Sequence, residues 1–380
     1  MERVFLYGTL LDEALLDIVT AGEAPALRPA ILEGHAAHWA QGESYPVLIA
    51  AGGGRARGAV CSPSAAALAR MDYYETAFGF FRAEVDVSFD VGGAGGAAPI
   101  STSVYFPPPD GWTLGAPFSL ADWSRQWGPM SRRAAAEVMG GFGIEPVGQV
   151  GRHFTQARVR ATSWLRAQSE DPPATLRAAH RADEAVKSHA IRTPYRNFFK
   201  AEEHEVSFRR FDGDMSAPVT RAAFVMGDAA TVLPYDPVRD RVLLIEQFRF
   251  GPYVRGDTKP WSLEPIAGRI DPGETAEAAV RREAVEEAGL TLADLHAVGS
   301  YYPSPGAVTE YLFSFVGIAD LPDSAAGIGG LASEAEDIRA QVVDFDRAFA
   351  LIGSGEAENG PLILSLYWLA LHRERLRAGG

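Results

Sequence analysis

The chain has very little cysteine, and this limits the kinds of protein that it can be. Cys61 is the only cysteine among 380 residues, so no disulfide can form within the chain, as is typical of proteins in a reducing compartment. No apolar run approaches the length of a membrane span. The eight histidines show neither the H-x3-H nor the H-E-x-x-H spacing of zinc sites. The sequence therefore predicts a cytoplasmic protein with neither a membrane span nor a zinc site.

Basic residues are also in short supply. Lysine and arginine total 35 against 49 aspartates and glutamates, which gives a net charge of −14. A chain this acidic is not attracted to nucleic acid or to an anionic membrane surface. The first thirteen residues already contain acids, and no small-residue cleavage site follows an apolar core, so we expect no signal peptide. An anionic substrate would need a local cation, which points to a bound metal.

The length predicts two domains with a connecting segment, because one hydrophobic core rarely serves 380 residues. Residues 1–112 alternate short β-favouring runs with glycine-rich stretches, of which "AGGGRARG" (51–58) and "GGAGGA" (92–97) are predicted to be hairpin turns. Residues 113–190 are rich in arginine and alanine and favour helices. We expect this helical connector to be packed rather than loose, because its tryptophans at 123, 127 and 164 need burial.

Residues 191–380 form the second predicted domain, where β-favouring runs return. The stretch "YDPVRD" (235–240) lies between two apolar runs and has turn chemistry, so the flanking strands are predicted to form a hairpin.

Carboxylates crowd into residues 268–290, "GRIDPGETAEAAVRREAVEEAGL". A turn at 271–273 precedes a predicted helix over 275–288, which Gly289 closes. Glu283, Glu286 and Glu287 stand at i, i+3 and i+4 and therefore project from one helix face. Three clustered carboxylates suit Mg²⁺ or Mn²⁺. The alternative is a solvated acidic face, which leaves the fixed spacing of the glycines and the arginine unexplained.

This spacing resembles the Nudix box, G-x5-E-x7-R-E-U-x-E-E-x-G-U, where U is aliphatic. Its fixed positions are filled by Gly268, Glu274, Arg282, Glu283, Ala284, Glu286, Glu287, Gly289 and Leu290. The resemblance implies that the three helical glutamates hold metal, and that Glu274 and Arg282 orient the loop. A match over so many positions is far more specific than a short glycine motif.

The wider segment 191–376 resembles the ADP-ribose pyrophosphatases of that family. In "WSLEPIAGRIDPGE" the resemblance makes the main-chain carbonyl of Ala267 a metal ligand, and Pro305 stands at the spacing associated with ADP-ribose. The stretch "IEQFR" resembles a strand of that family whose arginine, here Arg249, binds the diphosphate. In "GLASEAEDI" the catalytic candidates are Glu334, the favoured base, and Glu336.

One position in this segment departs from the pattern. Arg221 in "TRAAF" matches a substrate-binding arginine, whereas Ala222 replaces the usual glutamate. The departure bears on a dimer or adenine contact and not on the chemistry.

The resemblance implies metal-dependent hydrolysis of the diphosphate of ADP-ribose to AMP and ribose 5-phosphate. The cofactor would be Mg²⁺ or Mn²⁺, the fold an α/β/α sandwich, and the assembly a homodimer through this domain. The alternative substrates are other nucleoside diphosphate sugars.

The N-terminal segment carries a second set of motifs. A strand enters a tight turn at Tyr7, Gly8, Thr9 and Leu10, and Glu75 comes just after a helix-like run. Together with "SYPVLIA" and "RARGAV" they resemble the γ-glutamylcyclotransferase-like β-barrels. The resemblance implies that Glu75 is an acid/base while a γ-glutamyl amine closes on its own side-chain amide to release 5-oxoproline.

Thr9 and Met71 replace the serine and leucine of that pattern, and Thr76 replaces a glycine beside the proposed catalytic group. The domain is therefore either a second enzyme or a non-catalytic module that binds a small carboxylate. The blandest alternative makes Glu75 a solvated carboxylate and Tyr7 a core aromatic. The whole chain is predicted to be a mixed α+β protein: barrel, helical connector and sandwich.

Overall fold

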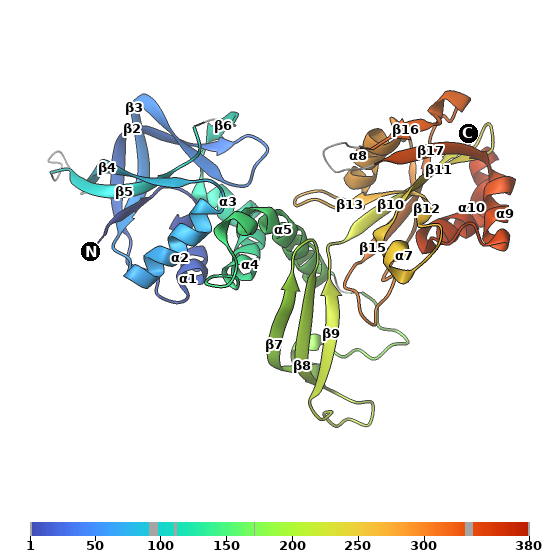
Figure 1. Cartoon of the computed structure of the whole chain (residues 1–380), viewed down its shortest axis with the longest axis horizontal. Coiled ribbons are helices and arrows are strands. Elements are labelled where there is room, and N and C mark those ends of the chain that lie inside the picture. Colours follow the sequence, from blue (N-terminus) through green and yellow to red (C-terminus); the bar gives the residue numbers. More distant parts are fainter. Residues whose placement is uncertain (1, 91–97, 110–111, 171, 331–336, 379–380) are drawn as a thin grey trace. The chain divides into compact units, whose positions relative to one another are not determined.

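A computed structural model describes residues 2–90, 98–109, 112–170, 172–330 and 337–378. The chain divides into two compact units, Met1–Asp171 and Pro172–Gly380. Both combine helices with sheets, so the predicted mixed α+β class is confirmed (Figure 1). Within the described residues no helix is both long and apolar enough to cross a membrane.

The first unit is built on a closed β-barrel. Its strands run in the order β3-β1-β5-β4-β2-β6, and β2 also pairs with β3, which closes the ring and leaves β6 outside it. Closure removes the exposed strand edges that an open sheet would have. The strands are β1 (Val4–Leu6), β2 (Arg28–Ala40), β3 (Pro46–Cys61), β4 (Phe81–Phe89), β5 (Ile100–Phe106) and β6 (Leu114–Pro117).

The expected hairpin turn at 51–58 is wrong, because these residues lie inside the long strand β3. The pairing of β3 with β2 is irregular there, and Gly53 adopts φ +75°. A Cβ on Gly58 would lie 2.1 Å from the main-chain oxygen of Leu6. The glycines therefore allow a bulge and a close strand approach, which glycine also serves inside strands. The second predicted turn, 92–97, lies outside the described residues.

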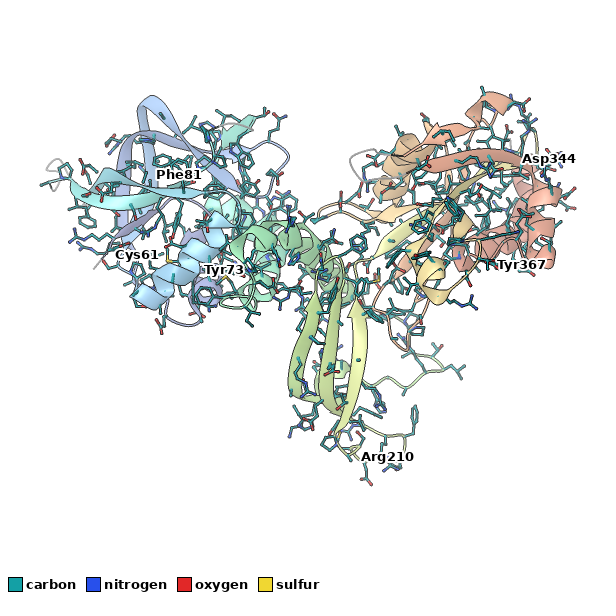
Figure 2. The ribbon with its side chains drawn as sticks, in the orientation of Figure 1. Cys61, Tyr73, Phe81, Arg210, Asp344 and Tyr367 are labelled. Atoms are coloured by element: carbon teal, nitrogen blue, oxygen red, sulfur yellow. The ribbon has the colours of Figure 1, made fainter. Side chains whose placement is uncertain are left out.

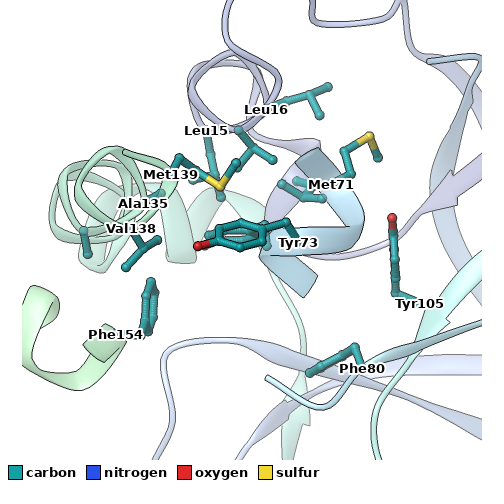
Figure 3. Close-up of a cluster of buried hydrophobic side chains, with 14 of the residues drawn as sticks. Leu15, Leu16, Met71, Tyr73, Phe80, Tyr105, Ala135, Val138, Met139 and Phe154 are labelled. Carbon is teal, nitrogen blue, oxygen red and sulfur yellow. The ribbon is translucent and has the colours of Figure 1, made fainter. Parts of the chain in front are cut away.

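The helices of the predicted connector share the hydrophobic core of the first unit. Figure 3 shows Val138 and Met139 of one connector helix and Phe154 of another near Tyr73. Trp123 is 1% exposed, as expected, whereas Trp164 is 42% exposed and stacks under the guanidinium of Arg133 at 3.8 Å. The helices of this unit are α1 (Glu13–Thr20), α2 (Ala65–Thr76), α3 (Leu120–Gln126), α4 (Gly128–Met139) and α5 (Val147–Ser169).

An ion pair ties the connector to the start of the barrel. Asp12 caps α1 by accepting a hydrogen bond from Leu15 N, and its carboxylate also binds Arg132 of α4 and Ser124 of α3. These donors, foremost Arg132, hold the pKa of Asp12 below its ordinary value despite partial burial. One carboxylate thus fixes the mutual positions of three helices.

Helix does not continue to residue 190 as the composition suggested. Only α6 (Ala182–Ala185) forms between 172 and 185, and β7 (Val186–Arg196) follows at once. Pairing with β8 (Lys200–Phe208) overrides the helix propensity of this segment. With β9 (Val219–Val225) they make a separate three-stranded sheet. Figure 2 shows Arg210 at the tip of this sheet.

The second unit is a sandwich around a mixed sheet with the path β14-β15-β10-β11-β17-β16, to which β12 and β13 add. The core that contains α8 and the core that contains α9 and α10 are formed by alternate residues of β10 and β11. The predicted α/β/α sandwich is therefore confirmed, and so is the hairpin at 235–240, because Tyr235 pairs with Val242.

The elements of this sandwich are β10 (Ala229–Asp236), β11 (Arg241–Phe248), α7 (Phe250–Arg255), β12 (Trp261–Glu264), β13 (Ile266–Arg269), α8 (Ala276–Ala288), β14 (Leu295–Tyr301), β15 (Leu312–Ile318), β16 (Gly327–Gly329), β17 (Ile338–Asp344), α9 (Phe345–Ser354) and α10 (Gly360–Ala378).

Candidate functional site

Helix α8 carries the acidic cluster and is fixed at both ends. The hydroxyl of Thr275 accepts a hydrogen bond from Ala278 N at 3.2 Å, and Gly289 closes the helix at φ +62°. Ala279, Val280 and Ala284 are fully buried against the sheet. Small side chains on this face let the helix lie close to the strands, so packing holds the backbone that carries the glutamates in place.

Arg282 is the centre of the polar network on α8. Its guanidinium donates through Nε and Nη2 to both carboxylate oxygens of Glu274, each at 3.1 Å. Nη1 donates to Glu283 at 2.7 Å and to Glu286 at 3.0 Å, and Nη2 also reaches the carbonyl of Arg269 at 3.0 Å. Although burial opposes the charge, these carboxylates raise the pKa of Arg282. One cation thus joins the helix to β13 and the preceding turn.

Gly268 is required by the closeness of β13 and α8. A Cβ at this position would lie 1.7 Å from Oε1 of Glu283. Ala267 precedes it in β13, the strand that lies against α8, and pairs with Thr231 of β10. At the other end of α8, a Cβ on Gly329 of β16 would lie 2.1 Å from the carbonyl oxygen of Glu287. Both glycines allow the backbone to approach the acidic helix.

The three helical glutamates fit a divalent cation by donor type but are not gathered around one point. No group of three or more histidine, cysteine or acidic side chains within the described residues is arranged to hold a metal. Arg282 donates to one oxygen each of Glu283 and Glu286. Glu287 is only 2% exposed, and burial of an ionised carboxylate is costly unless positive charge or donors compensate it. Hard oxygen ligands of this kind suit Mg²⁺ or Mn²⁺.

The predicted substrate residues lie in different settings. Arg249 donates to the carboxylate of Glu264 through Nε at 3.0 Å and Nη2 at 2.6 Å, and its side chain is 41% exposed. Arg221 is exposed on β9 and donates to the carbonyl of Thr220. Glu334 and Glu336 lie outside the described residues.

Glu310 was missed by the sequence analysis. Burial raises the pKa of its carboxyl, Arg269 and Arg249 oppose this shift, and Asp228 adds to it. The charges of these three side chains thus act on Glu310, and one of them, Arg269, directly follows the first glycine of the box. The available signal was the position of Glu310, five residues after Pro305 in the same loop.

A pocket opens in the first unit, with about 680 Å³ of space between its walls and mouth. A concave and mostly apolar lining of this kind is typical of small-molecule sites. Half of the sixteen lining residues are aromatic, and the predicted loop and glutamate are both among them. The lining residues are Leu6, Tyr7, Gly8, Thr9, Leu10, Ser44, Tyr45, Pro46, Tyr74, Glu75, Phe78, Phe80, Tyr105, Trp123, Ser131 and Phe154.

Glu75 is the acidic group of this pocket, at the last turn of α2. Burial among the aromatic side chains raises its pKa to about 8, so the carboxyl is largely protonated at neutral pH. Burial, followed by the charge of Glu75, also raises the pKa of Tyr7, while a hydrogen bond from the backbone of Leu48 opposes the shift. A carboxyl that titrates near pH 8 is suited to proton transfer with an amine.

Two other residues limit the chemistry of this unit. Thr76 is still helical and its hydroxyl donates to the carbonyl of Asp72, so the glycine that it replaces is not needed for an unusual backbone conformation here. Cys61 is buried, and burial raises the pKa of its thiol to about 12, so it is not a thiolate nucleophile.

Comparison with known proteins gives two matching family models. The model described as "NUDIX domain" matches residues 226–366. The model described as "Gamma-glutamyl cyclotransferase, AIG2-like" matches residues 4–125. The second match ends before α4 and α5, which supply Ser131 and Phe154 to the pocket.

Curated relatives match the second half of the chain. ADP-ribose pyrophosphatase of Escherichia coli (strain K12) is 44% identical over 188 residues, which is 50% of this chain and 89% of the relative. ADP-ribose pyrophosphatase of Haemophilus influenzae (strain ATCC 51907 / DSM 11121 / KW20 / Rd) is 35% identical over 200 residues, or 52% and 92%. GDP-mannose pyrophosphatase of Escherichia coli O1:K1 / APEC is 33% identical over 175 residues, or 46% and 90%.

The raised pKa of Glu75 predicts a pH-dependent stability. Between its ordinary value of 4.5 and about 8, the folded state binds a proton that the unfolded state releases. The contribution of the protonated Glu75 to the free energy of unfolding is therefore fully present below pH 4.5. It is lost as pH rises, by at most about 1.4 kcal/mol per pH unit, and the loss levels off above pH 8. Glu75→Gln removes this loss, so urea unfolding should show the variant gaining stability relative to wild type from pH 5 to 8. Glu84→Gln, at an exposed position on β4, is the control. Parallel curves for wild type and Glu75→Gln would contradict the assignment.

Proposed function

The chain belongs to the Nudix family, and we propose that its second unit hydrolyses the diphosphate bond of ADP-ribose to give AMP and ribose 5-phosphate. The observation that carries this proposal is the network in which Arg282 joins Glu274, Glu283 and Glu286 around the glycine turn of the box. The relatives named ADP-ribose pyrophosphatase support the choice of substrate, because they match over about nine tenths of their own length.

The metal ligands proposed are Glu283, Glu286, Glu287 and the carbonyl of Ala267. Bound Mg²⁺ or Mn²⁺ would neutralise the diphosphate and lower the pKa of a water molecule. Each contact of Arg282 with Glu283 and Glu286 engages one of the two carboxylate oxygens. The arginine therefore orients the ligands and offsets their mutual repulsion before a cation arrives.

The remaining roles fall to residues around this helix. Glu334 is proposed as the general base that takes a proton from the attacking water, with Glu336 as a supporting or metal-contacting group. Arg249 binds non-bridging oxygens of the diphosphate, for which a planar guanidinium is suited. It must exchange part of its pairing with Glu264, and its 41% exposure leaves it accessible to substrate.

The second candidate substrate of this unit is another nucleoside diphosphate sugar. The 33% identical relative named GDP-mannose pyrophosphatase favours it. The spacing of Pro305 favours ADP-ribose instead. A panel of ADP-ribose, ADP-sugars, GDP-mannose and NADH with each metal distinguishes them, because a higher kcat/KM for GDP-mannose or NADH would reject ADP-ribose while leaving the Nudix assignment intact.

Glu287→Gln is expected to abolish most ADP-ribose hydrolysis. The change keeps the side-chain shape but removes a ligand charge, so activity should fall by at least about 10²-fold and require more metal. Glu277→Gln, at an exposed position in the first turn of the same helix, should behave as wild type. Near-wild-type kcat of Glu287→Gln at saturating Mg²⁺ would contradict the metal site.

By contrast, Glu334→Gln should lower kcat by about 10²–10⁴-fold with an unchanged metal requirement.

The three-stranded sheet is proposed to pair with that of a second copy. It exposes several large apolar side chains that a lone sheet would leave in water: Val186, Ile191, Tyr195, Phe208 and Phe224, each at least 40% exposed. Cross-strand pairing groups Val186, Ile191 and Phe208 on one face of the sheet. An exposed apolar cluster of this kind marks an association surface. The resemblance to the ADP-ribose pyrophosphatases, which implies a homodimer through this domain, points to a second copy of this chain as the occupant.

Light scattering at micromolar concentration should therefore give the mass of a dimer, about twice 40.8 kDa. Ile191→Asp places a charge on the exposed face of β7 and should shift the mass toward that of the monomer. Val238→Asp, exposed in a turn, is the matched control. A monomer mass for the unchanged chain would refute the dimer.

A second activity is proposed for the first unit, favoured by the aromatic pocket around Glu75. In a γ-glutamyl amine, the α-amino nitrogen bonds to the side-chain amide carbon and the bond from that carbon to the leaving nitrogen breaks. Glu75 takes the proton from the attacking amine and returns it to the leaving amine, so 5-oxoproline and a free amine result.

A reducing cytoplasm is the proposed compartment of the chain, since Cys61 is a buried free thiol.

Release of 5-oxoproline from γ-glutamyl-alanine by the full chain tests this activity. The rate should rise with pH as Glu75 ionises near pH 8, and Glu75→Gln should lower kcat by at least about 10²-fold. Hydrolysis of ADP-ribose by the same variant should be unchanged. Binding without turnover in the wild-type chain would instead identify the unit as a ligand-binding module.

A further inference from the structure

A cation on α5 lies beside the pocket of the first unit without being assigned to either activity. Arg158 is four residues after the pocket-lining Phe154, so the two project from the same face of the helix. Its side chain is 17% exposed, and its Nη1 is 3.7 Å from Oε2 of Glu43. Glu43 immediately precedes two further lining residues, Ser44 and Tyr45.

Arg158 is incompletely satisfied in this position. Its distance to Glu43 exceeds a hydrogen bond, and Glu43 is itself 38% exposed. Nε of Arg158 is buried and has no hydrogen-bond partner within the described residues. A buried donor that stays unpaired is costly, and such groups often mark a functional site.

The positive charge of Arg158 acts on one side of the pocket. Burial raises the pKa values of Tyr45 and Tyr74, and Arg158 opposes the shift at both hydroxyls. Tyr74 also responds to Glu75, whereas Tyr7 responds to Glu75 and not to the arginine. The charge of Arg158 is thus felt at the part of the pocket lined by Tyr45 and Tyr74, and Glu75 is the acidic lining residue.

We propose that Arg158 binds a carboxylate on the leaving-amine half of the ligand, so that the pocket selects γ-glutamyl amino acids over γ-glutamyl alkylamines. This inference rests on the proposed cyclotransferase activity of the same pocket. The reacting nitrogens must lie at Glu75, and a carboxylate one carbon beyond the leaving nitrogen extends away from it. Arg158 offers a planar pair of donors for that group, in an aromatic setting that strengthens the charge interaction.

A matched pair of substrates isolates the carboxylate. γ-Glutamyl-alanine and γ-glutamylethylamide differ only in the carboxylate of the leaving half. With the wild-type chain, KM should be at least about tenfold lower for the alanine compound. Arg158→Met should raise that KM by about 10–100-fold and leave KM for the ethylamide and both kcat values nearly unchanged, as expected for loss of a charge-assisted contact.

Three further variants separate recognition from folding. Arg158→Lys keeps the charge and should recover part of the preference. Arg152→Met changes an exposed arginine on the same helix and should leave both KM values unchanged. Glu43→Gln removes the competing carboxylate and should lower KM for γ-glutamyl-alanine. An equal effect of Arg158→Met on both substrates would overturn the proposal, and so would no effect on either.

Binding measurements keep this test separate from catalysis. In the Glu75→Gln background, isothermal titration with the same two compounds should show the same preference, and Arg158→Met should abolish it. If the wild-type chain turns over neither compound but the binding preference depends on Arg158, the cyclotransferase activity fails while carboxylate recognition stands. Equal Kd values for the two compounds in the Glu75→Gln background would overturn the recognition itself.

Discussion

The guanidinium of Arg282 is the group on which the acidic site depends. Glu283, Glu286 and Glu287 would repel one another on adjacent turns of α8, and Arg282 offsets this repulsion from within the same helix. Its fifth contact, to the carbonyl of Arg269, anchors the arrangement to the sheet. Without that cation Glu283 and Glu286 would lose the donor that holds them, and the glycine turn would lose its link through Glu274.

The close approach of backbone to α8 is the second condition for this arrangement. A side chain at position 268 would collide with Glu283. The helix cannot move away from the sheet to make room, because its alanine face is buried there. Charge and packing thus determine the same geometry. Arg282 holds the carboxylates in place along the helix, and the glycine and alanines set the distance between the helix and the sheet.

Much of this was predictable from the sequence because it depends on local patterns. The box predicted α8 and its closing residue Gly289, since helix ends are decided within a few residues. Thr275, predicted as the first helical residue, is the N-cap instead. The turn at 235–240 was predictable for the same reason. The prediction of a turn at 51–58 fails because a glycine in this stretch is needed for contact with a strand that is distant in the sequence. Gly58 lies against the main chain of Leu6, where a side chain would not fit. Likewise β7 forms against helix-favouring composition because β8 pairs with it.

Individual contacts were harder to predict than elements. The sequence identified Glu75 and Arg249, but the raised pKa of the first and the pairing of the second with Glu264 arise from three-dimensional surroundings. Glu310 was missed because a single acid in a loop gives no periodic signal. The roles proposed for Glu334 and Glu336 still depend on the family pattern alone.

The supply of pocket walls by α4 and α5 has a consequence for modularity. Ser131 and Phe154 close a cavity whose barrel is complete before them, and Trp123, Met130 and Val138 bury the same core. The barrel therefore cannot be excised at residue 125 without opening both its ligand site and its interior. The natural seam for recombination, or for cutting the chain into portable halves, lies after α5, where the first compact unit ends.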